Sequence, residues 1–342
     1  HHMFAVGMGP IADSAFSVST MLIAIPTGVK IFNWLGTMWG GALRFTTAML
    51  FAIGLVALFT IGGISGVMHS SPPADLQQTD TYFVVAHFHY VLFGGSMMGL
   101  FAGTYYYYPK IIGRLMNERL GKWHFWLTFA GMNLTFFPMH FVGLDGMARR
   151  IYQYDTNQGW NLSNAIISMV GYPLLALGTL IFLINLVRSR TRGQRAGPDP
   201  WGAPTIEWTL PSPVPEYNFA RIPTITSRYP LWDRKSPELT AQVPHTKAGE
   251  QRIDVELGGK HVGEVTDVPA DVELNAEDAH PSAHQLGIHL PTPTVKPLIA
   301  SLGLTISFAG LIWGKNVPVM VFGGVILVVA LYAWFLTPLE EH

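Results

Sequence analysis

The sequence predicts an all-α fold: a polytopic transmembrane helix bundle, an extramembrane tail and a C-terminal helical hairpin. Of the 342 residues, 49% are hydrophobic and only 13% are charged, whereas roughly a quarter of the residues in a soluble domain are charged. Apolar stretches long enough to cross a bilayer as helices recur along the chain. Cysteine is absent, so any metal ion must be held by histidine, methionine or carboxylate. The formal net charge of −1 gives no basis for a nucleic-acid partner.

Five apolar spans form the first predicted region, residues 1–192. They are expected at residues 14–36, 42–68, 82–108, 122–143 and 162–187. Basic residues mark cytoplasmic boundaries, and they cluster in residues 110–122, after the third span, and in residues 188–195, after the fifth. The second connection, residues 69–80, contains no lysine or arginine. The loops therefore alternate between the two sides of the membrane.

Residues 193–295 differ in composition from the spans. Proline is frequent and no long apolar run occurs, so we expect a Pro-rich, acidic cytoplasmic tail or linker. Within it, residues 251–274 alternate weakly between apolar and polar types and suit a small β-hairpin. Residues 296–338 contain two further apolar spans, at 297–313 and 318–337, which we expect to form an appended transmembrane hairpin.

His87 and His89 lie in the third span. Each residue of a helix turns by roughly 100°, so these two side chains point about 200° apart. They cannot ligate one ion, but each can bind a different metal centre on its own side of the helix. Ionisable side chains inside a membrane are costly and usually functional. This favours ligation over the alternative, two interfacial histidines hydrogen-bonded to neighbouring helices.

The first span carries a polar stripe that includes Thr27 and Lys30. These residues are three apart and share one face of a helix. A polar stripe ending in lysine inside a membrane resembles a proton- or ion-conducting path. Lys30 could instead snorkel to the cytoplasmic boundary, and the stripe alone slightly favours that simpler interpretation.

Arg149 and Arg150 lie between the fourth and fifth spans, in a connection that should face outside. Adjacent arginines there indicate a local anionic partner, because guanidinium forks suit carboxylates and phosphates. Pairing with Asp145 and Asp155 of the same loop is an equally good interpretation.

Asp80 directly precedes the histidine-bearing span. We expect it either to cap that helix or to ligate a hard cation at the outer surface. His69, His124 and His140 lie near span ends, and we interpret them as ordinary interface residues.

Four motifs occur in order along the chain. They are His1-His2-Met-Phe, the Ile-Pro-Thr-Gly-Val-Lys of residues 25–30, the Asp-Thr-Tyr-Phe-Val-Val-Ala-His-Phe-His-Tyr of residues 80–90, and the Gly-Met-Ala-Arg-Arg of residues 146–150. Together they closely resemble subunit I of the haem-copper oxidases, in particular the cytochrome c oxidases. The resemblance covers about residues 1–225, which would correspond to the C-terminal part of the oxidase core.

The resemblance implies metal-ligand roles for four histidines. His87 would ligate the high-spin haem that binds oxygen, and His89 would ligate the low-spin haem on the opposite side. His1 and His2 would ligate the copper ion of the oxygen site. Further ligands lie upstream in the family, so this stretch is expected to be inactive by itself.

Other matched residues imply roles around these centres. Thr27 and Lys30 match a proton path to the oxygen site, and Arg149 and Arg150 match a pair that hydrogen-bonds haem propionates. Asp80 matches a ligand of an outer magnesium or manganese site, although the preceding residue is a threonine where many relatives have histidine.

The resemblance therefore predicts the catalytic subunit of a terminal oxidase, multi-pass in a bacterial cell membrane. It would reduce dioxygen to water with electrons from cytochrome c and translocate protons. The implied cofactors are two haems of the A type and one copper ion, with Mg²⁺ or Mn²⁺ outside. The implied partners are subunit II, which receives the electrons at copper, and subunit III. A quinol oxidase is the alternative within the family, and a scaffold or channel without redox centres is the alternative outside it.

Overall fold

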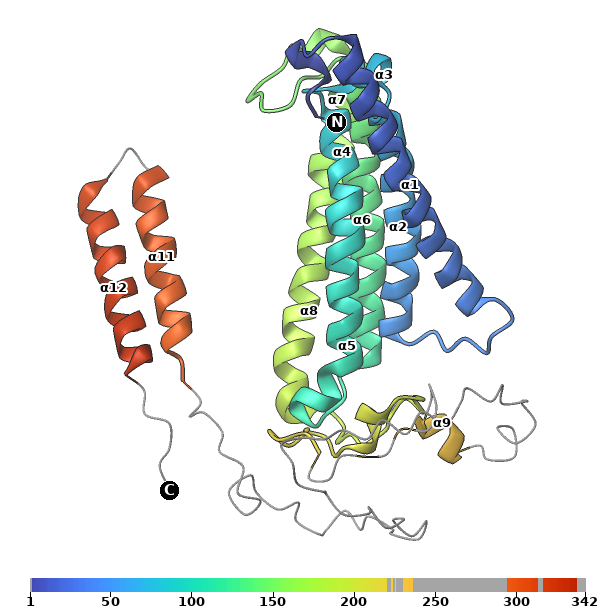
Figure 1. The fold of residues 1–342 in the computed structure, drawn as a ribbon, viewed down its shortest axis with the longest axis vertical. Coiled ribbons are helices and arrows are strands. Elements are labelled where there is room, and N and C mark those ends of the chain that lie inside the picture. Colours follow the sequence, from blue (N-terminus) through green and yellow to red (C-terminus); the bar gives the residue numbers. More distant parts are fainter. Residues whose placement is uncertain are drawn as a thin grey trace, which may run out of the picture. The chain divides into compact units, whose positions relative to one another are not determined.

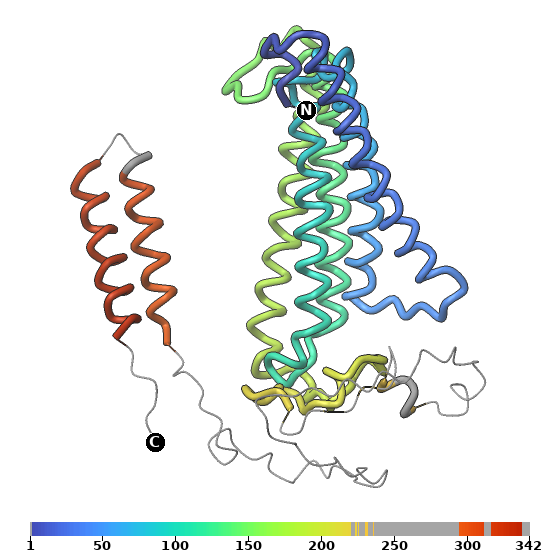
Figure 2. The backbone as a smooth tube through the Cα atoms, viewed as in Figure 1, coloured from blue at the N-terminus to red at the C-terminus, as the bar shows by residue number. Residues whose placement is uncertain are grey.

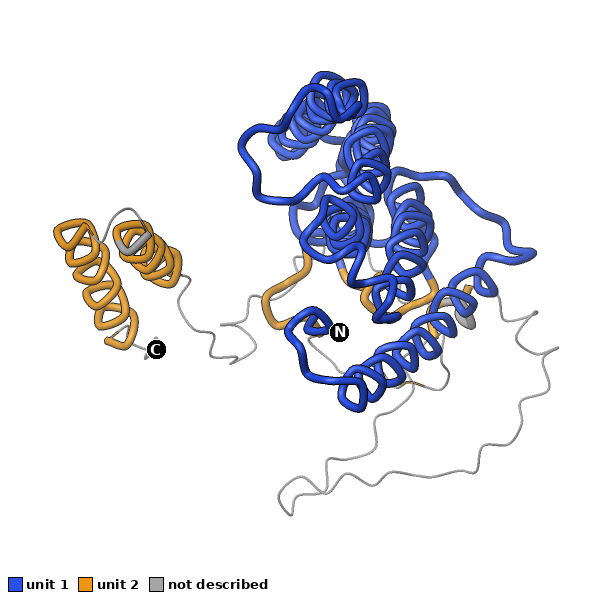
Figure 3. The backbone as a smooth tube through the Cα atoms, turned by 90° about the horizontal axis from the view of Figure 1, so that it is seen from above, with its two compact units in different colours: residues 1–203, 211–213 blue, residues 204–210, 214–342 orange. Residues whose placement is uncertain are grey.

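The computed structural model describes residues 2–219, 223, 225, 230–235, 294–312 and 316–336. The chain divides into two compact units (Figure 3), residues 1–203 with 211–213 and residues 204–210 with 214–342. Helices dominate the described residues of both units. In the described part of the chain, β-structure is limited to isolated bridges, Thr81 with Ala148 and Arg114 with Arg195.

The first unit contains five long helical stretches that could each cross a membrane (Figure 1). They are α1 (Pro10–Met38), α2 (Thr47–His69), α4 (Tyr82–Val91) continued by α5 (Met98–Ile112), α6 (Glu118–Leu144), and α7 (Asn161–Ala165) continued by α8 (Tyr172–Arg192). They lie at the positions of the five predicted spans and extend most of them by a few residues. The predicted all-α membrane bundle is confirmed.

Two of these stretches contain a π-helical turn. One, Leu92–Met97, joins α4 to α5, and the other, Ile166–Gly171, joins α7 to α8. Such turns are rare and occur frequently at functional sites. The first follows the two histidines of α4 directly.

A short helix that the sequence pattern did not predict, α3 (Pro72–Gln78), lies between α2 and α4. Two prolines form its first turn, where the fixed φ of proline suits a helix start. The other short helices in the described residues are η1 (Phe4–Val6), η3 (Thr156–Gln158), η5 (Ile206–Thr209) and α9 (Pro230–Lys235).

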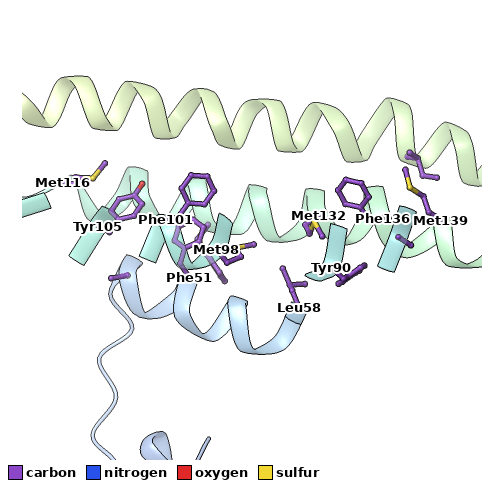
Figure 4. Packing of buried hydrophobic residues seen from close by; sticks show 14 of the residues in the cluster. Phe51, Leu58, Tyr90, Met98, Phe101, Tyr105, Met116, Met132, Phe136 and Met139 are labelled. Carbon is purple, nitrogen blue, oxygen red and sulfur yellow. The ribbon is translucent and has the colours of Figure 1, made fainter. Parts of the chain in front are cut away.

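Large apolar side chains fill the space between α2, α4, α5 and α6 (Figure 4). The row includes Phe51, Leu58, Tyr90, Met98, Phe101, Tyr105, Met132, Phe136 and Met139. Because lipid tails are as apolar as these side chains, close packing stabilises such a bundle more than burial does.

Glycines allow the helices to approach closely where α4 is positioned. A Cβ atom at Gly143 of α6 would collide with the backbone of Phe83 in α4. A Cβ atom at Gly171, just before α8, would collide with Thr135 of α6. Small residues at helix contacts are typical of membrane bundles. Gly143 therefore sets how closely α6 lies to the histidine-bearing helix.

Helix α1 differs from the other spans because none of its residues is buried. Near its start, Ser17 Oγ donates to the carbonyl oxygen of Ser70 at 2.7 Å. Figure 1 shows α1 diverging from α2 towards its Met38 end. It is the least packed span of the first unit.

The second unit contains a hairpin of α11 (Lys296–Ile312) and α12 (Val317–Phe335), the orange-to-red helices of Figure 2. Gly303 and Gly323 bring the two backbones into close contact. Helix α12 is long and apolar enough to cross a membrane, whereas α11 is a shorter apolar helix. The β-hairpin predicted at residues 251–274 lies outside the described residues.

Candidate functional site

His87 lies on the face of α4 that meets α2. Its Nδ1 atom is 3.0 Å from the carbonyl oxygen of Gly62 and 2.9 Å from Oγ of Ser65. A carbonyl oxygen can only accept a hydrogen bond, so Nδ1 carries the proton and donates it to Gly62. The Nε2 atom of the neutral ring is then unprotonated, and its lone pair is open to a metal ion.

Helix α2 also fixes the position of the His87 ring by direct contact. A Cβ atom at Gly66 would lie 3.1 Å from Cε1 of His87, so only glycine lets the ring lie this close to α2. The ring is therefore held by a hydrogen bond on one edge and by the backbone of α2 beside it.

His89 faces the other side of α4, towards α6. Its Nδ1 atom donates to the carbonyl oxygen of Val85, one turn earlier, at 2.7 Å. Its ring stacks on Phe136 of α6 with centroids 4.0 Å apart and an interplanar angle of 13°. The two histidines thus face different helices, as the helical period predicts, and each keeps Nε2 open.

A third histidine, His69, lies against His87 at the end of α2. The ring centroids are 4.8 Å apart, and Nδ1 of His69 is 3.4 Å from Oδ1 of Asp75. Both residues are buried, at 1% and 2% exposure. The interpretation of His69 as an ordinary interface residue is therefore wrong. Asp75 could have indicated this role of His69, because it lies six residues later in a polar connection that offers it no lysine or arginine as a partner.

Several buried polar atoms in this region have no hydrogen-bond partner among the described residues. They are both ring nitrogens of His69, Oδ2 of Asp75 and Oε1 of Gln78. Burial raises the pKa of the Asp75 carboxyl above its ordinary value. Because buried polar atoms in proteins are nearly always paired, these groups fit a site that receives a further polar group.

Asp80 and Arg149 form an ion pair at the outer end of α4. Nε and Nη2 of Arg149 donate to Oδ1 of Asp80 at 3.0 and 2.7 Å. The backbone N–H of Arg149 also donates to the carbonyl oxygen of Asp80 at 2.9 Å. The anionic partner of Arg149 is therefore Asp80, and of the two interpretations left open by the sequence, the pairing with Asp145 and Asp155 is wrong.

The expectation that Asp80 caps the following helix is also wrong. Thr81 is the N-cap of α4, and its Oγ1 accepts from the N–H of Phe83 at 3.2 Å. Asp80 has a φ of 59°, which is left-handed, whereas a capping residue is typically extended. This turn frees the carboxylate of Asp80 to reach Arg149.

The other predicted site residues lie apart from these pairs. Thr27 Oγ1 donates to the carbonyl oxygen of Ile23 at 2.9 Å, and Lys30 is exposed on α1. Arg150 is exposed with a φ of 65°. His2 is exposed, but the part of its ring that is covered lowers its pKa by desolvation. His1 lies outside the described residues.

The two remaining histidines, His124 and His140, pack against neighbouring helices. His124 is fully buried, and its Nδ1 atom lies 3.2 Å from the hydroxyl of Tyr105. His140 is half-buried against Phe83 and Tyr90. Within the described residues, no three His, Asp or Glu side chains are placed to hold one metal ion by themselves. Any metal bound through His87 or His89 therefore needs ligands from outside this set.

Comparisons with known proteins agree on one family. Residues 1–198 match the family described as Cytochrome C and Quinol oxidase polypeptide I. The chain is 44% identical to cytochrome c oxidase subunit 1 of Alkalihalophilus pseudofirmus over 313 residues, which are 91% of this chain and 44% of that protein. It is 40% identical to cytochrome c oxidase subunit 1 of Bacillus sp. PS3 over 348 residues, 100% of this chain and 50% of that protein.

A relative with a different name matches about as well. The chain is 45% identical to quinol oxidase subunit 1 of Bacillus subtilis over 250 residues, 72% of this chain and 38% of that protein. The chain spans about half the length of the curated relatives it matches. The relatives are therefore longer than this chain, and each match covers one part of the relative.

Proposed function

The chain belongs to the family of cytochrome c and quinol oxidase polypeptide I, and on that premise we propose that it is part of the catalytic subunit of a terminal oxidase. It is a multi-pass protein of a bacterial cell membrane. The proposed reaction of the complete subunit is the reduction of dioxygen to water, coupled to proton translocation. One observation carries the proposal: His87 and His89 face opposite helices, each with Nδ1 bonded to a carbonyl and Nε2 open.

We assign His87 to the haem that binds oxygen and His89 to the second haem. A histidine that donates from one nitrogen to a carbonyl is a stronger ligand through the other nitrogen. The neutral form also adds no charge to a dry membrane interior. Bound haem and copper would supply the redox chemistry of dioxygen reduction. Within this chain, Gly62 and Gly66 position one imidazole, and Val85 and Phe136 position the other.

We assign the copper ion of the oxygen site to His1 and His2, from the match to the family motif. His2 contributes imidazole, a ligand that suits copper. These two histidines do not complete a copper site by themselves, so the proposal requires ligands from the rest of the complete subunit.

We assign Arg149 and Arg150 to the haem propionates. A guanidinium group has five N–H donors, and the pair with Asp80 engages only two groups of Arg149, Nε and Nη2. Arg149 can therefore hold a propionate and Asp80 together, and the fixed positive charge offsets a carboxylate in low dielectric. Asp80 keeps Oδ2 for an outer Mg²⁺ or Mn²⁺ ion, whose ligands are oxygens.

Thr27 and Lys30 are proposed to begin the proton path to the oxygen site. They share one face of α1, and the hydroxyl of Thr27 donates to the backbone carbonyl oxygen of Ile23. The path supplies protons that the apolar membrane cannot.

We propose cytochrome c as the electron donor, with subunits II and III as partners. Two cytochrome c oxidase subunits and one quinol oxidase subunit match at 40% to 45% identity, so the donor must be measured. The test is oxygen uptake by the purified full-length complex, supplied in turn with reduced cytochrome c and with a quinol. Uptake with cytochrome c and visible haem bands are expected. Uptake with quinol alone would assign the other donor, and a colourless complex would support the scaffold alternative.

A further inference from the structure

A polar cavity lies at the inner ends of α6 and α8. Its volume is about 310 Å³, enough for the head group of a phospholipid. Basic residues gather at this end of the helices, which is therefore the cytoplasmic end. The lining residues are Leu115, Met116, Asn117, Glu118, Arg188, Ser189, Arg192, Gly193, Gln194 and Trp201.

Arg188 and Arg192 give this cavity its positive charge. They are four residues apart on α8, so they share one face, and both are exposed. Neither belongs to the ion pair formed among the described residues, Arg149 with Asp80.

Two other charged groups nearby are already engaged. Oε2 of Glu118 accepts from the N–H and from Oγ1 of Thr47, each at 2.9 Å. Nη1 of Arg114 donates to the carbonyl oxygen of Gly193 at 2.7 Å. Arg188 and Arg192 are thus the cations of the cavity that remain available to an anion.

The position of the cavity indicates a ligand from the membrane. Trp201 stacks on Tyr106 with centroids 6.0 Å apart and an interplanar angle of 14°, and its Nε1 donates to the carbonyl oxygen of Tyr106 at 2.9 Å. Tryptophan and tyrosine mark the head-group level of a bilayer. The cytoplasmic leaflet is rich in anionic lipids. The first turn of α6 also places the positive end of a helix dipole at the cavity.

We propose that this cavity binds the phosphate of an anionic phospholipid from the cytoplasmic leaflet, through the guanidinium groups of Arg188 and Arg192. Two guanidinium forks can bind the phosphate oxygens in a two-pronged geometry. The head group would then join α8 to the start of α6. This site is separate from the histidines of α4 and does not depend on their assigned roles.

The test measures lipid retention in the purified, delipidated full-length complex. Native mass spectrometry would follow binding of dioleoylphosphatidylglycerol, with the zwitterionic dioleoylphosphatidylcholine as the comparison lipid. The Arg188→Gln/Arg192→Gln variant is compared with Arg119→Gln/Arg190→Gln, which removes the same charge at the same end of the bundle but outside the cavity. Each cavity arginine should contribute roughly fivefold in affinity, so the first variant should bind the anionic lipid about 25-fold more weakly.

Three results would overturn the proposal. The cavity variant could bind the anionic lipid as tightly as the parent complex. The control variant could lose as much affinity, which would indicate surface charge in general. Millimolar inorganic phosphate could displace the lipid completely, which would make this a free-phosphate site. Thermal unfolding midpoints of both variants, measured in detergent alone, would show that the fold is retained.

Discussion

Replacing Gly66 with alanine tests whether α2 positions the ring of His87. The added Cβ atom would lie 3.1 Å from Cε1 of His87, whereas ordinary contacts begin at 3.4 Å. The ring would have to move by a few tenths of an ångström, away from its hydrogen bond to Gly62. Overpacking costs about 1–3 kcal/mol, and replacing a helical glycine recovers about 1 kcal/mol. We expect a net loss of up to about 2 kcal/mol in the free energy of unfolding.

The assay is resonance Raman spectroscopy of the reduced full-length complex, with the thermal unfolding midpoint measured in parallel. The iron–histidine stretching frequency of the high-spin haem reports the bond to His87 and the hydrogen bond on its far nitrogen. Gly63→Ala is the matched control, because a Cβ atom there meets nothing within 4 Å in the described structure. We expect a shifted frequency in Gly66→Ala only. An unchanged frequency and midpoint in that variant would refute the positioning role of α2.

Three further predictions concern the supporting residues. Asp80→Asn should cost less than about 1 kcal/mol, because the Asp80 side chain is 72% exposed, and unfolding midpoints should show the loss at low salt and not at high salt. Burial raises the pKa of Asp75 above 3.8, so the folded protein holds the carboxyl proton more tightly than the unfolded chain does. Stability should therefore fall as the pH rises from 3.8 through the raised pKa of the folded state. Asp75→Asn should remove this decline. If the variant and the parent protein show the same slope of unfolding midpoint against pH, Asp75 is not the group that titrates. Gly143→Ala should lower the free energy of unfolding by about 1–3 kcal/mol or more, because the backbone of Phe83 cannot move away from the added Cβ atom. The unfolding midpoint should fall with it. Gly103→Ala, which meets nothing within 4 Å in the described residues, should not lower it.

The helical spans and the two-sided histidine helix could be predicted because both depend on local periodicity. Apolar length sets where a helix can cross a bilayer, and a two-residue spacing sets the angle between His87 and His89. The turn geometry at Asp80 could not be predicted from the sequence. Its left-handed φ, the capping role of Thr81 and the helix α3 depend on contacts made after the chain has folded.

Long-range pairs were the main source of error. Asp80 and Arg149 are 69 residues apart, and nearby acids in the loop of Arg149 offered a simpler partner. His69 resembled an interface residue because its burial comes from α3 and from the ring of His87. Charge and spacing indicate which groups need a partner, but the packing of the helices determines which partner they meet.

The most direct test of the account is a comparison of His87→Ala and His89→Ala in the full-length complex. Reduced optical spectra would be recorded with and without carbon monoxide, with His140→Ala as a control from the same end of the bundle. The account predicts that His87→Ala abolishes the carbon monoxide shift and keeps the low-spin band, whereas His89→Ala loses the low-spin band. If both variants keep the parent spectra, or if they lose the same band, the two histidines do not serve two centres and the central claim is wrong.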